Sequence, residues 1–139
     1  MLYELPKAGT VKKKQVSVGR GKYRIDLIAI VTNDGLIVSI TGGEKSHVGA
    51  VAVGLPRPSL ERPSKLSATT SVLTLFGHKD DELAKPAAEK LAKELNQTVV
   101  VVAGVHVEEA RLDDIRKLVH NSMQVVDVFL EKLRNSSEG

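Results

Sequence analysis

The sequence contains no cysteine and no tryptophan, and only four aromatic residues. Without cysteine there are no disulfides, no thiolate catalysis and no Cys-bound zinc, so any metal would need His, Asp or Glu ligands. Proteins that bind single-stranded nucleic acid usually stack the bases on several aromatic rings. The composition therefore argues against nucleic acid as a partner. The four aromatic residues are Tyr3, Tyr23, Phe76 and Phe129.

Long hydrophobic runs are also missing. No apolar stretch approaches the roughly 20 residues that span a bilayer, and the N-terminal stretch lacks the apolar core of a signal peptide. We therefore expect a cytoplasmic protein without a membrane segment. A length of 139 residues with 42% hydrophobic content fits one globular domain. We expect this domain to cover 1–139, with a basic N-terminal segment (1–13), a loop (56–70) and a tail (135–139).

The net charge of +3 conceals an uneven distribution. Residues 1–25 contain seven Lys and Arg against one Glu, whereas residues 78–139 contain nine basic against twelve acidic residues. A basic N-terminal edge could attract nucleic acid, a phosphate-bearing ligand or an acidic partner. It could equally protect an exposed edge strand from aggregation.

The first half of the chain has the pattern of β-strands. Apolar and polar residues alternate, and Asn33-Asp34-Gly35 is typical of a hairpin turn. The next segment, 47–56, is rich in small residues, so another backbone or a flat ring could approach it closely; Ala50 and Ala52 are candidates to lie under such a ring. The prolines within 56–70 then predict a loop, which is either a lid or an ordinary connection. The expected strands are 14–19, 22–32, 35–41 and 47–56.

The second half alternates strands with helices. The spacing predicts a helix over 81–95 that ends at Asn96, and a second helix over 109–134. The wide apolar stripe of this last helix indicates either a dimer contact or complete burial. Together these elements predict an α+β fold in the order β-β-β-β-β-α-β-α, a mostly antiparallel six-stranded sheet with two helices packed on one face. The remaining expected strands are 71–77 and 98–107.

Three histidines lie near strand ends. The β-α-β order predicts that strands 71–77 and 98–107 are parallel, so His78 and His106 should emerge at the same end of the sheet. With His47 or a carboxylate they could bind a metal, although no H-x-H or H-x-x-x-H pair is present. A His78–Asp80 or His106–Glu108 pair could support acid–base catalysis, although no nucleophile motif accompanies it. The third alternative is a binding pocket or plain structure, with Asp80 or Asp81 as a helix N-cap.

The stretch around Gly42 and Gly43 is rich in glycine but is not a P-loop, because the G-x-x-x-x-G-K-[ST] spacing is missing and a strand follows. The two glycines could form a nest of backbone N–H groups for an anion, with Lys45 nearby. A tight hairpin with a bulge is the alternative.

Three blocks together resemble one known family. They are "GGEKSHVGAVAVG", "TTSVLTLFGHKDDELAKPAAEKLAKEL" and "TVVVVAGVHVEEA", and the "GHKDD" and "GVHV" elements within them are the most specific. The family is that of the prenylated-flavin chaperone domains typified by the D subunit of gallate (hydroxyarylic acid) decarboxylases. The resemblance covers roughly residues 20–133.

The resemblance implies a non-catalytic accessory protein that helps to supply prenylated FMN, bound transiently, to a UbiD-type decarboxylase. It also implies a fold similar to the proteasome assembly chaperones, often paired into homodimers. It gives no catalytic residue and no metal ligand. Two alternatives stay open: a protein-only assembly chaperone, and a small His-based or metal-dependent enzyme. The candidate cofactor-binding residues are Gly42, Gly43, Glu44, His47, His78, Lys79, Asp80 and His106.

Overall fold

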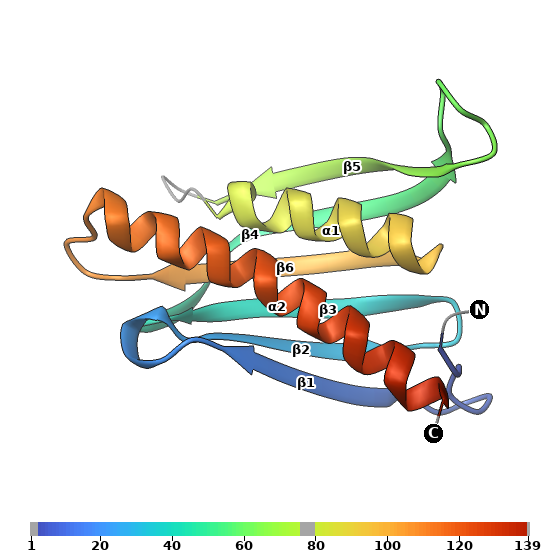
Figure 1. The fold of residues 1–139 in the computed structure, drawn as a ribbon, viewed down its shortest axis with the longest axis horizontal. Helices are drawn as coiled ribbons and strands as arrows, with labels where there is room; N and C mark the ends of the chain where they lie inside the picture. Colours follow the sequence, from blue (N-terminus) through green and yellow to red (C-terminus); the bar gives the residue numbers. More distant parts are fainter. Residues whose placement is uncertain (1–2, 76–79, 139) are drawn as a thin grey trace.

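The computed structural model describes residues 3–75 and 80–138, and these form one six-stranded sheet with two helices on one face (Figure 1). The strand order is β1-β2-β3-β6-β4-β5, and only the β3–β6 pair is parallel among the described strands. The predicted α+β class and element order are confirmed. The strands are β1 (Lys12–Val18), β2 (Ile25–Val31), β3 (Gly35–Gly43), β4 (Lys45–Pro58), β5 (Leu66–Thr74) and β6 (Thr98–His106). The helices are η1 (Gly21–Tyr23), α1 (Asp81–Leu95) and α2 (Leu112–Glu138).

The core lies between the sheet and the helices. Strand β2 buries alternate side chains from Ile25 to Val31, as expected for a strand with one covered face. Helix α1 packs on β4, β5 and β6, whereas α2 crosses β1 and β2 (Figure 1). On α2, Val125 and Phe129 are fully buried. The wide apolar stripe of this helix is therefore explained by burial within one chain, the second of the two alternatives.

Small residues let α1 approach β4 closely. A Cβ on Gly54 would lie 2.5 Å from the carbonyl oxygen of Ala88, so only glycine fits there. Ala50 and Ala52 are fully buried on the same face. Of the two alternatives for this segment, close approach of another backbone is the one found. The expectation that these alanines lie under a flat ring is wrong.

The expected loop over 56–70 is also wrong in its bounds. Strand β4 continues to Pro58 and β5 begins at Leu66, so the connection covers only 59–65. Beyond Gly54, β5 is the only neighbour of β4 among the described strands, because the pairing of β4 with β6 stops there. A strand with one open side tolerates proline, which lacks an N–H to donate. Pro56 and Pro58 therefore lie in the part of β4 that is paired on one side only, and the strand continues through them.

One further expectation is confirmed and one needs correction. Strands β5 and β6 run in the same direction, as expected, with β4 between them. Helix α2 begins at Leu112, three residues later than expected, since Glu109 adopts a positive φ of 50° that no helix continues. Neither helix in the described part is both long and apolar enough to cross a membrane.

Candidate functional site

A bulge in β4 forms the centre of the site. Strand β4 pairs with β6 at Ser46–Val105 and again at Ala50–Ala103, so residues 47–49 face Gly104 alone. A Cβ on Gly104 would run into the carbonyl oxygen of His47. The bulge therefore requires glycine at this position of β6. It turns the His47 side chain toward the start of α1.

The carboxylate of Asp80 holds this bulge in place. Its Oδ2 lies 2.9 Å from Nε2 of His47, and its Oδ1 accepts the N–H of Val105 at 3.1 Å. Only 5% of Asp80 is exposed. Gly49 leaves room for the carboxylate, since a Cβ there would lie 2.6 Å from Cγ of Asp80. One side chain thus joins the start of α1 to both β4 and β6.

The expectation that Asp80 or Asp81 caps α1 through its side chain is wrong for Asp80. Asp80 precedes the helix but makes no side-chain cap hydrogen bond. Its backbone carbonyl instead accepts the N–H groups of Leu83 and Ala84. The carboxylate is turned away from the helix toward His47, so its role is to connect elements.

His106 forms a second polar pair beside the first. Its Nε2 lies 3.2 Å from Oε1 of Glu108, which is the pair that the sequence predicted. The N–H of Glu108 donates to Oε1 of Glu44 at 3.2 Å. The rings of His47 and His106 meet edge to face with their centroids 6.0 Å apart. Two histidines and three carboxylates, including Asp80, therefore gather at this end of the sheet.

The glycine-rich turn between β3 and β4 crosses the end of β6, because β6 lies between these two strands in the sheet. Gly43 has a φ of +77°, and its N–H donates to the carbonyl oxygen of Arg24. The next N–H, of Glu44, donates to the carbonyl oxygen of His106 at 2.8 Å. Because the N–H groups of Gly43 and Glu44 already donate to backbone carbonyls, they are not available to an anion. The alternative of a tight hairpin is wrong, because β3 and β4 each pair with β6 and not with each other.

Some predicted site residues lie outside the described residues, namely His78 and Lys79. The predicted His78–Asp80 pair and the predicted proximity of His78 to His106 both involve His78, so both stay predictions. Within 3–75 and 80–138, no group of three His, Asp or Glu side chains is placed to hold a metal ion.

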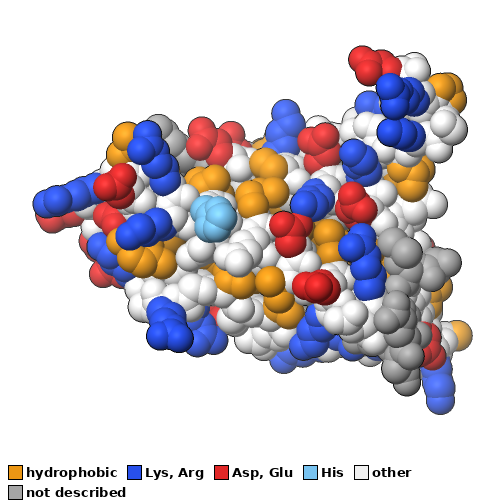
Figure 2. All heavy atoms as spheres, in the orientation of Figure 1, with side chains coloured by type: hydrophobic (Ala, Val, Ile, Leu, Met, Phe, Trp, Pro, Cys, Tyr) orange, Lys and Arg blue, Asp and Glu red, His pale blue; other side chains and the backbone are white. Residues whose placement is uncertain are grey.

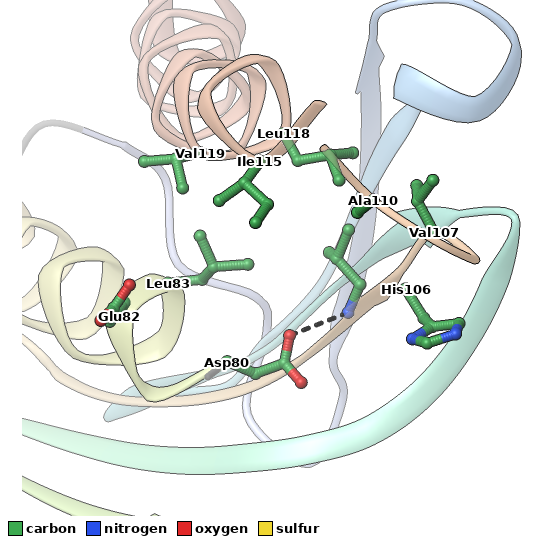
Figure 3. A pocket seen from close by; sticks show the side chains of 10 residues that line it. Asp80, Glu82, Leu83, His106, Val107, Ala110, Ile115, Leu118 and Val119 are labelled. Atoms are coloured by element: carbon green, nitrogen blue, oxygen red, sulfur yellow. Dashed lines mark hydrogen bonds between the residues drawn. The ribbon is translucent and has the colours of Figure 1, made fainter. Parts of the chain in front are cut away.

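An apolar cavity of about 240 Å³ adjoins the polar cluster. In Figure 3 the side chains of Leu83, Ile115 and Val119 point toward one another between the two helices, with Asp80 and His106 at the cavity's edge. The dashed line in Figure 3 is the hydrogen bond from the N–H of Val105 to Asp80. The site thus combines an apolar space with a polar, rigid border.

Sequence reasoning missed two parts of this site. Helix α2 contributes Ile115 and Val119 to the lining. Helical spacing places both in the apolar stripe of the helix, because it does not distinguish a core position from a cavity wall. The pairing of His47 with Asp80 joins residues 33 positions apart, and no local pattern predicts it. The small residues Gly49 and Gly104 were the available signal, since both lie in the family-like blocks.

Comparisons with known proteins agree on the fold and the family. The model of the prenylated flavin chaperone LpdD-like domain matches residues 19–134. A solved structure of a chaperone complex for yeast 20S proteasome assembly is 16% identical, with a TM-score of 0.58 over 91% of this chain and 97% of that chain. This likeness concerns the fold alone. No curated protein matches the sequence. Since the family model covers most of its length, the chain belongs to the prenylated flavin chaperone LpdD-like domain family.

Proposed function

We propose that this protein is a non-catalytic chaperone that binds prenylated FMN transiently and passes it to a UbiD-type decarboxylase. The observation that carries the proposal is the apolar cavity beside the motif residues Asp80 and His106, both within the part of the chain that the family model matches. Prenylated FMN differs from FMN by an added apolar isoprenoid unit. An apolar cavity of this kind provides selectivity for the prenylated form.

The size of the cavity supports transient binding. Sites that enclose a whole small molecule typically measure ~300–1,000 Å³, whereas this cavity measures about 240 Å³. It therefore accommodates the isoprenoid portion and leaves the rest of the cofactor outside. A ligand held by one part is released more readily than an enclosed one, as a carrier requires.

The polar border supports a binding role rather than catalysis. Both oxygens of Asp80 already interact, with His47 and with the N–H of Val105. Such a carboxylate fixes the shape of the site. Gly42, Gly43 and Glu44, at the turn between β3 and β4, extend this border. With Lys79 and His78 they complete the proposed cofactor-binding set.

The protein also needs a surface for pairing, and we propose that it forms a homodimer through the sheet face that carries no helix. The cross-strand register places Ile37 beside Ile30 and Val100, and Val51 beside Leu73 and Val102. Ile37 is 50% exposed and Leu73 is 65% exposed. An apolar face of this extent, without charge in its middle rows, fits a second copy of itself, as in an isologous dimer.

Titration of the purified protein with FMN and with prenylated FMN, followed by visible absorbance, tests the proposed function. We expect prenylated FMN to bind at least about tenfold more tightly than FMN, because each buried CH₂ contributes about 0.8 kcal/mol. The variant Ala110→Leu, which places a larger side chain in the cavity wall, should weaken this preference. Ala8→Leu, in the exposed N-terminal turn, is the matched control.

Failure of both flavins to bind at roughly tens of micromolar protein would sink the cofactor role and favour the protein-only assembly chaperone. Co-purification then separates the two chaperone functions, since recovery of a decarboxylase supports the first and recovery of proteasome subunits the second.

One observation favours the enzyme alternative, namely the His47–Asp80 pair. A carboxylate that orients an imidazole is what general base catalysis uses. If His47→Ala abolished a turnover while leaving flavin and partner binding intact, the chain would be a catalyst and the proposed chaperone function would be wrong.

A further inference from the structure

A second concave surface shares no lining residue with the apolar cavity. It is a groove of about 410 Å³ between the turn around η1 and the first half of α2. Figure 2 shows Lys and Arg side chains, with Asp and Glu side chains between them, at the end of the molecule that carries η1 and the beginning of α2. The groove is lined by Gly19, Arg20, Tyr23, Arg116, Lys117, His120 and Asn121.

The two walls of the groove are tied together by hydrogen bonds. The hydroxyl of Tyr23 donates to Oδ1 of Asp114 at 2.5 Å, and Nδ2 of Asn121 donates to the carbonyl oxygen of Tyr23 at 2.8 Å. Gly19 has a φ of +83°, and a Cβ there would lie 2.7 Å from Nδ2 of Asn121. Gly19 therefore leaves the floor of the groove without a side chain, and the hydrogen bonds fix the two walls. The groove is thus formed before any ligand binds.

The charges around the groove are only partly compensated. Lys22 lies 3.4 Å from Asp114, and Arg116 makes a long, exposed contact of 3.9 Å with Asp113. For Arg20 and Lys117, the described residues provide no ion pair. The ammonium of Lys117 lies 4.8 Å from the centre of the Tyr23 ring, which keeps it at the groove without neutralising it. A net positive charge remains across both walls.

We propose that this groove binds the phosphate group of a small phosphate monoester. Arg20 on one wall and Lys117 on the other supply charged donors, and Arg and Lys form strong hydrogen bonds with phosphate oxygens. The ring of Tyr23 and the aliphatic stems of the basic side chains offer contact to the organic part. The volume lies within the ~300–1,000 Å³ usual for small-molecule sites. The site is separate from the apolar cavity and does not depend on the proposed handling of prenylated FMN.

A nuclear magnetic resonance titration tests this assignment, with inorganic phosphate and phenyl phosphate as probes at constant ionic strength. We expect both to shift the backbone amides of residues 19–23 and 116–121, with phenyl phosphate binding more tightly because its ring adds apolar contact. In the double variant Arg20→Ala/Lys117→Ala the dissociation constant for phosphate should rise about tenfold or more.

The matched control is Arg62→Ala/Lys65→Ala, which removes the same two charges from the exposed β4–β5 connection and should leave binding unchanged. An equal loss in the control would reduce the effect to general charge attraction and overturn the proposal. So would benzoate binding as tightly as phenyl phosphate, because the groove would then not distinguish phosphate from carboxylate. Saturation by a poly-glutamate peptide without any effect of phosphate would assign the groove to an acidic protein segment instead.

Discussion

Nε2 of His47 lies 2.9 Å from Oδ2 of Asp80, and this contact joins the β4 bulge to the start of α1. The same carboxylate accepts the N–H of Val105 on β6. Three elements that are distant in the sequence are thus held by one buried side chain. The motif that resembles a catalytic cluster works in the fold as a clamp, and the adjoining cavity depends on it for its shape.

Removal of the clamp should destabilise the protein strongly. Asp80→Ala leaves the N–H of Val105 and the imidazole of His47 without their partner, which should lower the free energy of unfolding by roughly 2–4 kcal/mol. Urea denaturation followed by circular dichroism measures this change. Asp81→Ala is the matched control, because Asp81 is the next residue, has the same side chain and is only half-buried. Similar losses in the two variants would show that the helix start, and not the clamp, accounts for the effect.

The bulge itself should depend on its two glycines. In Gly104→Ala the new Cβ collides with the backbone carbonyl of His47, which cannot rotate away as a side chain can. We expect a loss of about 2–3 kcal/mol or more and faster hydrogen exchange at the Val105 amide. Gly49→Ala should have a related effect, because its Cβ displaces the Asp80 carboxylate.

Gly21→Ala serves as the control for this prediction. A Cβ there meets nothing within 4 Å, so only its φ of +58° is unfavourable, at a cost of about 1 kcal/mol. If Gly104→Ala were no worse than Gly21→Ala, the close approach of the bulge to β6 would be refuted.

Local patterns predicted the elements but not the partners of the site residues. Helix α1 begins and ends where the sequence indicated, because Asn96 adopts the left-handed conformation that stops it, with a φ of 52°. The valine-rich strand β6 lies between β3 and β4, and an unbroken apolar run is typical of such a central strand. These features depend on residues within a few positions of one another.

Long-range contacts account for the features that local sequence patterns did not predict. Tyr23 and Asp114 are 91 positions apart, and Asn121 is 98 positions from Tyr23. The strand order places β4 between β5 and β6, which no turn motif specifies. The position of basic residues such as Arg20 beside α2 therefore depends on long-range contacts and not on the local sequence.

Stability should depend on pH through Asp114. Its pKa is lowered from 3.8 to about 2, chiefly by the hydroxyl of Tyr23 and then by the backbone N–H of Arg111, with a further contribution from Lys22. The folded protein thus favours the ionised carboxylate more than the unfolded chain does. The stabilisation is present above about pH 4 and disappears as the pH falls toward 2.

This dependence can be measured by urea denaturation at several pH values. Asp114→Asn should remove that part of the pH dependence and lower stability at neutral pH, whereas Asp113→Asn should change little, since the Asp113 side chain is 87% exposed. Parallel pH profiles for wild type and Asp114→Asn would contradict the assignment.

A charge on the open sheet face should prevent the proposed dimer. Ile37→Asp places one carboxylate from each copy between two apolar faces, and burial of an unpaired charge costs several kcal/mol. Sedimentation velocity should therefore show a dimer for the wild type and a monomer for this variant. Leu60→Asp is the control, because Leu60 is 88% exposed in the β4–β5 connection and should leave the dimer intact. A wild type that stays monomeric up to roughly 100 µM would mean that the apolar face serves a different partner, and the decarboxylase would then be the first to test.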